Sequence, residues 1–277
     1  MKTWCLVLSL LLALNADAQV FYRRSEFGAA IGSAHYFGDL NPTIGFKDIA
    51  YSGGIFYKYN FTHYIALRMG LSYGNVGYSD RYSGNPYQQV RNLDFRSNII
   101  EGHVAAEFHF FQYAIGDFDH RFTPYVSIGM GYFRYDPYTT YMGKRYLLRP
   151  LGTEGQLFEE YKDRRYNGGA IAFPIGIGVK FWLSKGLTIS LEAVNRSTTT
   201  DYLDDVSTTY VGKDLFDNAD PGPYPSASSQ LQDRSQELTA SPIGTKGRQR
   251  GISTTKDQYL FFQLGVSFRL PTYRCPN

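Results

Sequence analysis

Two short pairs of ionisable residues in the first half of the chain have the types needed for acid–base or metal chemistry. Glu101 and His103 form one Glu-x-His pair, and Glu107 and His109 form a second. A carboxylate beside an imidazole can transfer a proton or hold a metal ion. Motifs this short also arise by chance. We therefore favour the plainer interpretation, in which both pairs belong to a network of salt bridges that fills the inside of the protein.

Five aspartates open the longest segment without a periodic pattern, residues 201–256. Carboxylates this dense could hold Ca²⁺, which takes about six to eight oxygen ligands. Their spacing is not that of an EF-hand loop, and aspartate is a common turn residue. We therefore expect turns here and no bound metal. The five residues are Asp201, Asp204, Asp205, Asp214 and Asp217.

A catalytic role finds little support in the sequence. A lipid-modifying barrel enzyme would need a serine or aspartate beside a histidine near the edge of the membrane. Of the five histidines, only His35 falls at a strand end on the predicted outer side. The sequence also shows no nucleophile-elbow motif. We expect no enzymatic activity, no catalytic residue and no cofactor.

The start of the chain has the pattern of a secretory signal peptide. Lys2 supplies the positive charge, residues 4–14 are apolar but too few to span a bilayer, and the Ala-Asp-Ala at residues 16–18 fits a cleavage site. We predict that residues 1–18 are a signal peptide and that residues 19–277 form one exported domain.

Cleavage there would leave Cys275 as the only cysteine, because Cys5 lies within the predicted signal peptide. An unpaired cysteine in an oxidising compartment points to a disulfide with another chain or to a free reactive thiol. Cys275 follows the last predicted strand on what would be the periplasmic side. We name it as a possible contact with a partner protein, the alternative being an accidental thiol in a frayed tail.

The elements that must position these residues are β-strands with two unlike faces. From 259 to 270, apolar residues alternate strictly with polar, small or aromatic ones, and a period of two over this length is typical of a strand between two different surroundings. One face carries Leu260, Phe262, Leu264, Val266, Phe268 and Leu270, and the other carries Tyr259, Phe261, Gln263, Gly265, Ser267 and Arg269. Eight such strands can be placed, at about 26–38, 51–61, 64–78, 95–111, 122–135, 168–183, 186–200 and 257–270.

The connections between these strands alternate in length. Short turns fall at 62–63, 112–121 and 184–185, whereas long loops fall at 39–50, 79–94, 136–167 and 201–256. This alternation is typical of an outer-membrane β-barrel, with its turns in the periplasm and its loops outside the cell. We therefore predict an all-β fold: an eight-stranded antiparallel transmembrane β-barrel with both termini in the periplasm.

The polar faces of the strands would line the inside of this barrel. Eight strands enclose only enough space for side chains, so we expect a packed interior rather than an open pore. Opposite charges would pair there because water is scarce. The inward-facing charged residues are Lys58, Arg68, Glu101, His103, Glu107, His109, Lys180, Glu192, Arg196 and Arg269.

Composition agrees with a membrane location. Aromatic residues make up 17% of the chain, with 24 Tyr and 20 Phe, and tyrosine suits a bilayer interface. After the predicted signal peptide, no segment is apolar for the 18 or so residues that a spanning helix needs. A net charge of +3 is too small to indicate nucleic-acid binding. The expected surroundings of the barrel are therefore outer-membrane lipids.

Three loop segments resemble a known family. They are Tyr36-Phe37-Gly38-Asp39-Leu40-Asn41-Pro42, Arg149-Pro150-Leu151-Gly152-Thr153-Glu154-Gly155, and the run from Asp201 to Val211 with sequence DYLDDVSTTYV. Their types and order resemble the PorG-type outer-membrane barrels of Bacteroidetes. The resemblance implies a component of the type IX secretion system that ties a periplasmic ring, built from a lipoprotein and its partner (PorK and PorN), to the outer membrane. On that reading Cys275 could form a disulfide with the lipoprotein.

Two alternatives stay open at this point. The protein could instead be a surface adhesin or ligand-binding barrel that acts through the loops 136–167 and 201–256, since long loops often carry function. The barrel could also have ten strands, with an additional hairpin drawn from residues 139–165.

Overall fold

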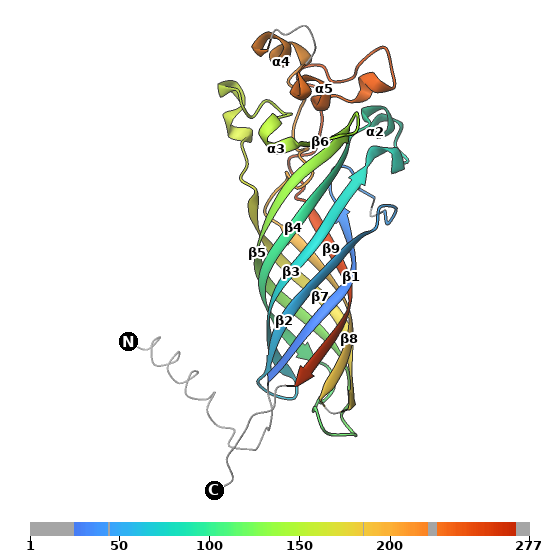
Figure 1. The fold of residues 1–277 in the computed structure, drawn as a ribbon, viewed down its shortest axis with the longest axis vertical. Coiled ribbons are helices and arrows are strands. Elements are labelled where there is room, and N and C mark those ends of the chain that lie inside the picture. Colours follow the sequence, from blue (N-terminus) through green and yellow to red (C-terminus); the bar gives the residue numbers. More distant parts are fainter. Residues whose placement is uncertain (1–24, 44, 185, 221–225, 270–277) are drawn as a thin grey trace, which may run out of the picture.

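The computed structural model describes residues 25–43, 45–184, 186–220 and 226–269, and these form a closed antiparallel β-barrel (Figure 1). Each barrel strand pairs with the next, and β1 pairs with β9 to close the ring, with Glu26 opposite Arg269. The predicted eight-stranded barrel is confirmed. Its strands are β1 (Ser25–Phe37), β2 (Ala50–Asn60), β3 (Ile65–Ser79), β4 (Asp94–His109), β5 (Phe122–Tyr141), β7 (Gly169–Ser184), β8 (Leu187–Thr198) and β9 (Gln258–Arg269).

Strand β5 is longer than predicted because its upper end forms a hairpin outside the ring. Its last residues pair with the short strand β6 (Lys144–Leu147), with Tyr141 opposite Lys144. The two residues between the strands, Met142 and Gly143, both have positive φ, as in the type I′ turns that are common in two-residue hairpins. The hairpin predicted as an alternative therefore exists, but it adds no strand to the barrel.

The strands have an apolar outside and a polar inside. Along β9, Phe262, Leu264 and Phe268 are exposed, whereas Tyr259 and Gln263 are buried. Every barrel strand exposes at least one large aliphatic side chain in this way: Ile31, Ile55, Leu71, Ile100, Ile128, Ile177, Leu191 and Leu264. Exposing so much apolar surface to water is unfavourable. The outer surface is therefore that of a barrel embedded in lipid.

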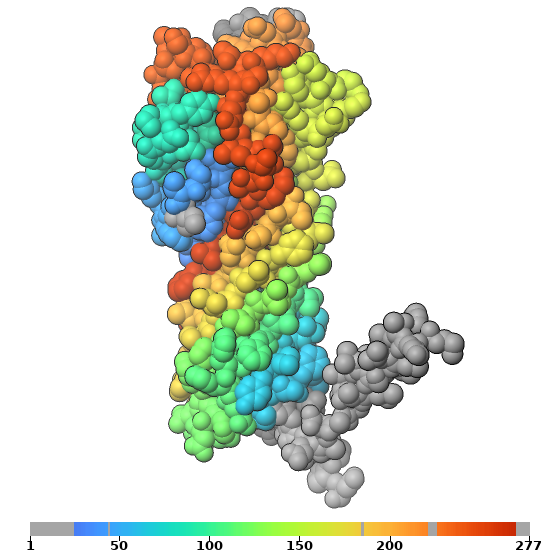
Figure 2. Space-filling view, turned by 180° about the vertical axis from the view of Figure 1, so that it is seen from behind, coloured from blue at the N-terminus to red at the C-terminus, as the bar shows by residue number. Residues whose placement is uncertain are grey.

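The connections are short at one end of the barrel, here called the turn end, and long at the other, the loop end (Figure 1). In Figure 2 the teal, yellow-green and orange segments of these long connections gather at the loop end. The described residues of the long loops, within 38–49, 80–93, 142–168 and 199–257, pack over the barrel mouth and are called the loop cap. They include η1 (Asp80–Tyr82), α2 (Pro86–Arg91), α3 (Leu148–Leu151), η2 (Glu159–Arg164), α4 (Lys213–Ala219), α5 (Ala227–Gln232) and η3 (Ser235–Glu237).

The helices of the loop cap are short, and their ends follow from local sequence. Helix α2 begins at Pro86, after Asn85 caps the backbone N–H of Tyr87, and it ends where Asn92 takes a left-handed conformation. Among the described residues, no helix has both the length and the apolar character that crossing a bilayer would require. The predicted signal peptide 1–18, with Cys5, and the candidate contact residue Cys275 lie outside the described residues.

Candidate functional site: the barrel interior and the loop cap

In the part of the barrel interior nearer the turn end, the charged side chains are arranged around Glu107 of β4. Its carboxylate lies 3.0 Å from Nζ of Lys58 and 3.3 Å from Nζ of Lys180. His109, two residues along the same strand, is 3.5 Å from Glu107 and accepts a hydrogen bond of 2.6 Å from Lys180 if its Nε2 is unprotonated. All four side chains are buried. The second Glu-x-His pair is therefore held in salt bridges with lysines from β2 and β7.

A second group of charges lies nearer the loop end. Glu101 is paired with Arg196 at 2.7 Å and contacts His103 at 3.3 Å. Arg68 reaches across the barrel to Glu192 at 2.5 Å. The cavity left beside these groups measures about 10 Å³, which is room for about one water molecule. The charged side chains thus fill the interior, and the predicted salt-bridge network is confirmed.

One predicted interior residue, Arg269, lies elsewhere, and the charged interior residue Glu26 was missed. Arg269 is only half-buried, because it sits at the turn end of the barrel. There it donates a hydrogen bond of 2.5 Å to the carbonyl of Ile115. Glu26 is fully buried and accepts hydrogen bonds from Asn60 and Ser267, both at 2.7 Å. The signal for Glu26 was present in the sequence, since it alternates with the outward-facing Phe27.

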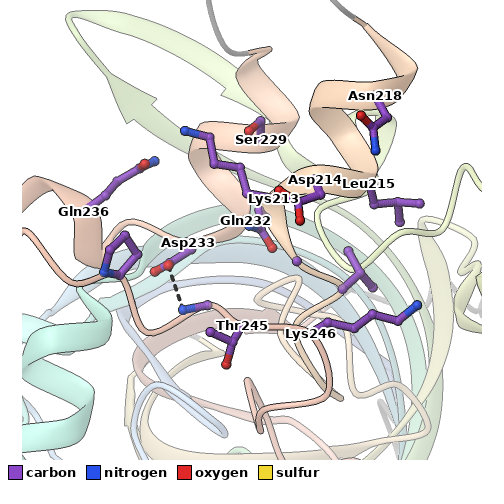
Figure 3. Close-up of a pocket in the computed structure, with 14 residues that line it drawn as sticks. Lys213, Asp214, Leu215, Asn218, Ser229, Gln232, Asp233, Gln236, Thr245 and Lys246 are labelled. Carbon is purple, nitrogen blue, oxygen red and sulfur yellow. Dashed lines mark hydrogen bonds between the residues drawn. The ribbon is translucent and has the colours of Figure 1, made fainter.

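The loop cap contains a hollow of about 610 Å³ between α4, α5 and the segment 242–246 (Figure 3). Its lining mixes amide and hydroxyl side chains with a few aliphatic ones. Gln232 and Ser229, both on α5, are almost completely buried there. In Figure 3 the residues that line the hollow lie above the strands of the barrel.

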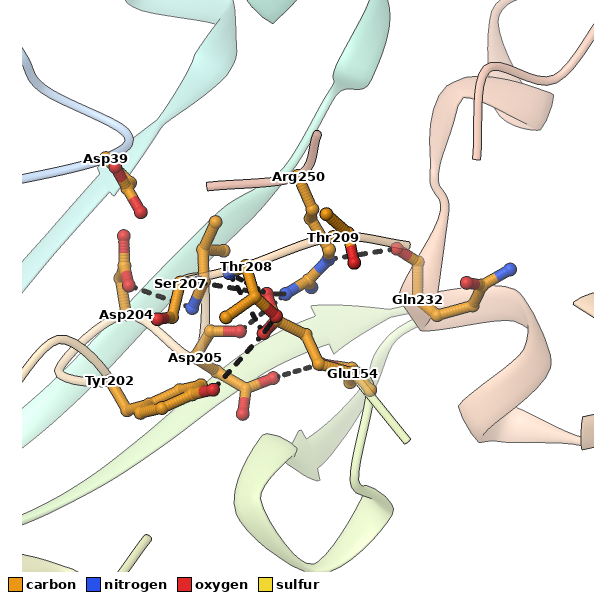
Figure 4. Close-up of polar contacts among 12 residues, drawn as sticks. Asp39, Glu154, Tyr202, Asp204, Asp205, Ser207, Thr208, Thr209, Gln232 and Arg250 are labelled. Carbon is orange, nitrogen blue, oxygen red and sulfur yellow. Dashed lines mark hydrogen bonds and ion pairs between the residues drawn. The ribbon is translucent and has the colours of Figure 1, made fainter. Parts of the chain in front are cut away.

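The three loop segments on which the family resemblance rests meet in the loop cap (Figure 4). Tyr36 donates to Asp204 at 2.6 Å, and Thr153 donates to Asp205 at 2.5 Å. Glu154 accepts from the hydroxyl of Thr208 at 2.6 Å. Segments separated by more than 50 residues in the chain are thereby joined by side-chain hydrogen bonds.

Glu154 is the most connected acid of the loop cap. Besides Thr208 it accepts a backbone hydrogen bond from Ser207 at 2.9 Å, and it pairs with Arg250 at 3.0 Å. Arg250 in turn donates to the carbonyls of Asp205 and Gln232. Both members of the ion pair are buried. Arg250 was not singled out from the sequence, because it lies in a polar stretch without periodicity.

The five clustered aspartates divide into two groups. Asp201, Asp204 and Asp205 are buried and hydrogen-bonded within the cap, and Asp205 has the positive φ of a turn residue. Asp214 and Asp217 lie on α4, so they are helical rather than turn residues. Among the described residues, no group of three or more His, Cys, Asp or Glu side chains is placed to hold a metal ion.

Burial changes the acidity of the cap carboxyls. It raises the pKa of Asp39 to about 7 and the pKa of Asp201 to about 6, because the charged form loses its hydration. The pKa values of Asp204 and Asp257 are also raised, first by burial and then by neighbouring carboxylates. Figure 4 shows Asp39 and Asp204 directed toward each other. Near neutral pH Asp39 is therefore close to half protonated, Asp201 is mostly ionised, and Asp204 and Asp257 hold a proton more readily than an exposed aspartate does.

Several solved structures are similar to this chain at low sequence identity. Neisserial surface protein A has 11% identity and a TM-score of 0.41, with 89% of this chain and 97% of that chain covered. Ail, the attachment invasion locus protein of Yersinia pestis, has 9% identity and a TM-score of 0.41, with coverages of 90% and 99%. The N-terminal β-barrel domain of Pseudomonas aeruginosa OprF has 13% identity and a TM-score of 0.36, with coverages of 90% and 98%.

No curated protein matches the chain. A family model described as "Domain of unknown function (DUF6089)" matches residues 1–214, which is more than half of the 277 residues. The chain therefore belongs to the DUF6089 family.

Proposed function

We propose that this chain is a non-catalytic outer-membrane barrel of the type IX secretion system, which anchors a periplasmic ring of a PorK-type lipoprotein and its PorN-type partner. The observation that carries the proposal is the contact between the three PorG-like loop segments. Tyr36, Glu154 and Asp204 belong to different segments, and each takes part in a buried hydrogen bond within the same cap. The resemblance thus rests on residues that pack together, which supports a shared structure rather than scattered matches.

The filled interior supports a role in binding rather than in transport. Glu107 and Glu101 are each held by cations from other strands, and breaking such buried pairs costs about 3–5 kcal/mol. A substrate could pass only by disrupting several pairs at once. An anchor, in contrast, needs no passage and no turnover.

The turn end offers a surface on which a ring subunit could bind. In the turn 110–121, Phe118 is 65% exposed, packs edge-on against Trp182 and lies under the guanidinium of Arg121. A hollow of about 560 Å³ lies beside it, between this turn and Phe181. Short turns alone provide little area, and stable interfaces usually bury more than about 1,000 Å². A disulfide from Cys275 to the lipoprotein would compensate, with both termini on the periplasmic side.

The test is purification of the tagged full-length chain from native outer membranes, with and without reductant, beside a Cys275→Ser variant. The expected result is a reductant-sensitive species that contains a periplasmic lipoprotein and is absent from the variant. Phe118→Ala should weaken the association that remains under reducing conditions, whereas Phe108→Ala, on the outward face of β4, should leave it unchanged. A monomer with an alkylatable Cys275 and no ring proteins would overturn the proposal.

A second function, binding of a ligand at the cell surface, is favoured by the loop cap itself. The loops 136–167 and 201–256 pack into a cap with a hollow rather than extending into solvent. One test of this function would be to delete residues 218–250. That deletion would also remove Arg250, whose contacts with Glu154 and Asp205 hold the cap together, so single substitutions within the hollow are the sharper test. These substitutions should leave secretion unaffected, whether the chain anchors a periplasmic ring or binds a ligand at the cell surface. Surface binding should be lost under the second.

A further inference from the structure

Two buried side chains of the hollow have hydrogen-bonding atoms without a partner. Within the described part of the chain, Oε1 of Gln232 and Oγ of Ser229 make no hydrogen bond, although these residues are only 1% and 0% exposed. Buried polar atoms are nearly always paired, because leaving one unpaired costs about 1–3 kcal/mol. Both residues line the hollow. In Figure 3, Gln232 extends from α5 toward the space above Thr245.

These side chains are fixed by the backbone that carries them. The carbonyl of Gln232 accepts a hydrogen bond of 3.2 Å from Arg250. The N–H of Ser229 donates to the hydroxyl of Ser226 at 3.2 Å. A binding site whose polar atoms are held in place loses little entropy when a ligand arrives. The unpaired acceptor of Gln232 therefore selects a ligand that can donate a hydrogen bond.

The charges around the hollow balance, which argues against an ionic ligand. Lys213 and Lys246 are matched by Asp214 and Asp233. Lys246 already pairs with Glu160 at 3.3 Å, and Asp233 already accepts from the backbone of Gly244 at 2.7 Å. A lining of this kind creates little net attraction for either an anion or a cation.

We propose that this hollow binds an uncharged saccharide, an inference that rests on the surface-binding function above and not on ring anchoring. Sugar hydroxyls both donate and accept, so they match the unpaired Gln232 and Ser229 and the amide of Asn218. Val211 and Leu215 supply an aliphatic patch for the C–H surface of a sugar ring. The volume of about 610 Å³ falls in the usual range for small-molecule sites, about 300–1,000 Å³.

A peptide is a poorer match for the same space. Extended peptides commonly bind by adding a strand to an exposed sheet edge. The hollow is bordered by α4, α5 and the irregular segment 242–246, none of which is a strand. The main chain of a peptide would therefore leave much of its hydrogen-bonding capacity unused.

The test uses the full-length protein in lipid nanodiscs, applied to an array of uncharged oligosaccharides, sulfated and sialylated oligosaccharides, and short peptides. Maltotriose and triacetylchitotriose then serve as calorimetric probes beside the strongest uncharged array member. Gln232→Leu should weaken that binding about tenfold, because one buried hydrogen bond is lost. Thr245→Val, at an exposed position of the lining, should weaken it about threefold and does not disturb the buried core of the cap. The matched control Thr255→Val lies in the cap outside the hollow and should bind as the wild type does.

Binding of an uncharged oligosaccharide that responds to both hollow variants would support the inference. If only anionic sugars or peptides bind, and Gln232→Leu weakens their binding, the proposal of an uncharged saccharide is overturned. The surface-binding function is then supported with a different class of ligand. If no probe binds, both the inference and the surface-binding function are overturned. None of these outcomes bears on association with a periplasmic ring.

Discussion

The phenolic oxygen of Tyr36 lies 2.6 Å from Asp204 and 2.8 Å from Asp257, in a part of the cap where all three side chains are buried. A phenol carries one proton, so it can donate to only one of the two carboxylates. The other contact requires a proton on that carboxyl group. Burial raises the pKa of both Asp204 and Asp257, which agrees with a proton shared among these oxygens.

The raised pKa values of Asp39, Asp204 and Asp257 predict that the loop cap is less stable in alkaline solution. Because the folded-state pKa of Asp39 is raised from 3.8 to about 7, its protonated form stabilises the cap fully below pH 3.8. That contribution falls as the pH rises and is lost above about 7. Amide hydrogen exchange of residues 201–211, corrected for intrinsic rates, should be slower at pH 5.5 than at pH 8.5.

Asp257→Asn supplies the matched control for the shared proton. The asparagine amide can donate to Tyr36 at every pH, while its oxygen can still accept from the N–H of Leu203, as Asp257 does now at 2.9 Å. The variant should therefore show a smaller difference in exchange between the two pH values. Equal or greater protection of the wild-type cap at pH 8.5 would contradict the shared-proton account.

Glu154→Gln should destabilise the loop cap more than any exposed charge change. The substitution leaves Arg250 buried without its ionic partner, which typically costs about 3–5 kcal/mol. Glu160→Gln breaks the exposed pair with Lys246 and should cost no more than about 1 kcal/mol. Limited proteolysis within 226–250 reports both. Comparable cleavage of the two variants would show that Glu154 does not hold the cap together.

In the barrel interior, Glu107→Gln should lower the stability of the whole barrel. It removes the anion that contacts both Lys58 and Lys180, so each of these buried cations would lose its directly paired counter-charge. The expected cost is about 3–5 kcal/mol in the free energy of unfolding, measured by urea titration in lipid vesicles. Adding Lys58→Met to this variant should recover part of the loss. Failure of the double variant to recover stability would argue against charge balance as the cause.

The barrel could be predicted from the sequence because its determinants are local. Alternation alone placed Phe262 outside and Gln263 inside, and the same parity placed nine of the ten predicted charged residues in the interior. Arg269 was the exception, since parity does not say where along the axis a strand end reaches a turn. Each strand position has only two faces, so a period of two leaves little ambiguity.

The loop cap could not be predicted in this way. Tyr36 and Asp204 are 168 residues apart, and Glu154 and Arg250 are 96 apart. Which loop residues meet depends on how four long connections fold over one opening, and no periodicity encodes that. The PorG-like segments gave the only hint, because they marked which loop residues share a pattern before their contacts were known.

The outward faces of the strands give the most direct test that this barrel spans a membrane. Ile177 of β7 is 66% exposed on the apolar outer face of the barrel, so Ile177→Arg would place a charge against lipid. Near the bilayer midplane such a change costs about 2–4 kcal/mol. Ile252, which is 45% exposed in the loop cap, is the matched control, and Ile252→Arg should change stability by less than about 0.5 kcal/mol because that position faces water. Unfolding in lipid vesicles separates the two, and equal tolerance of both arginines would mean that β7 does not face lipid.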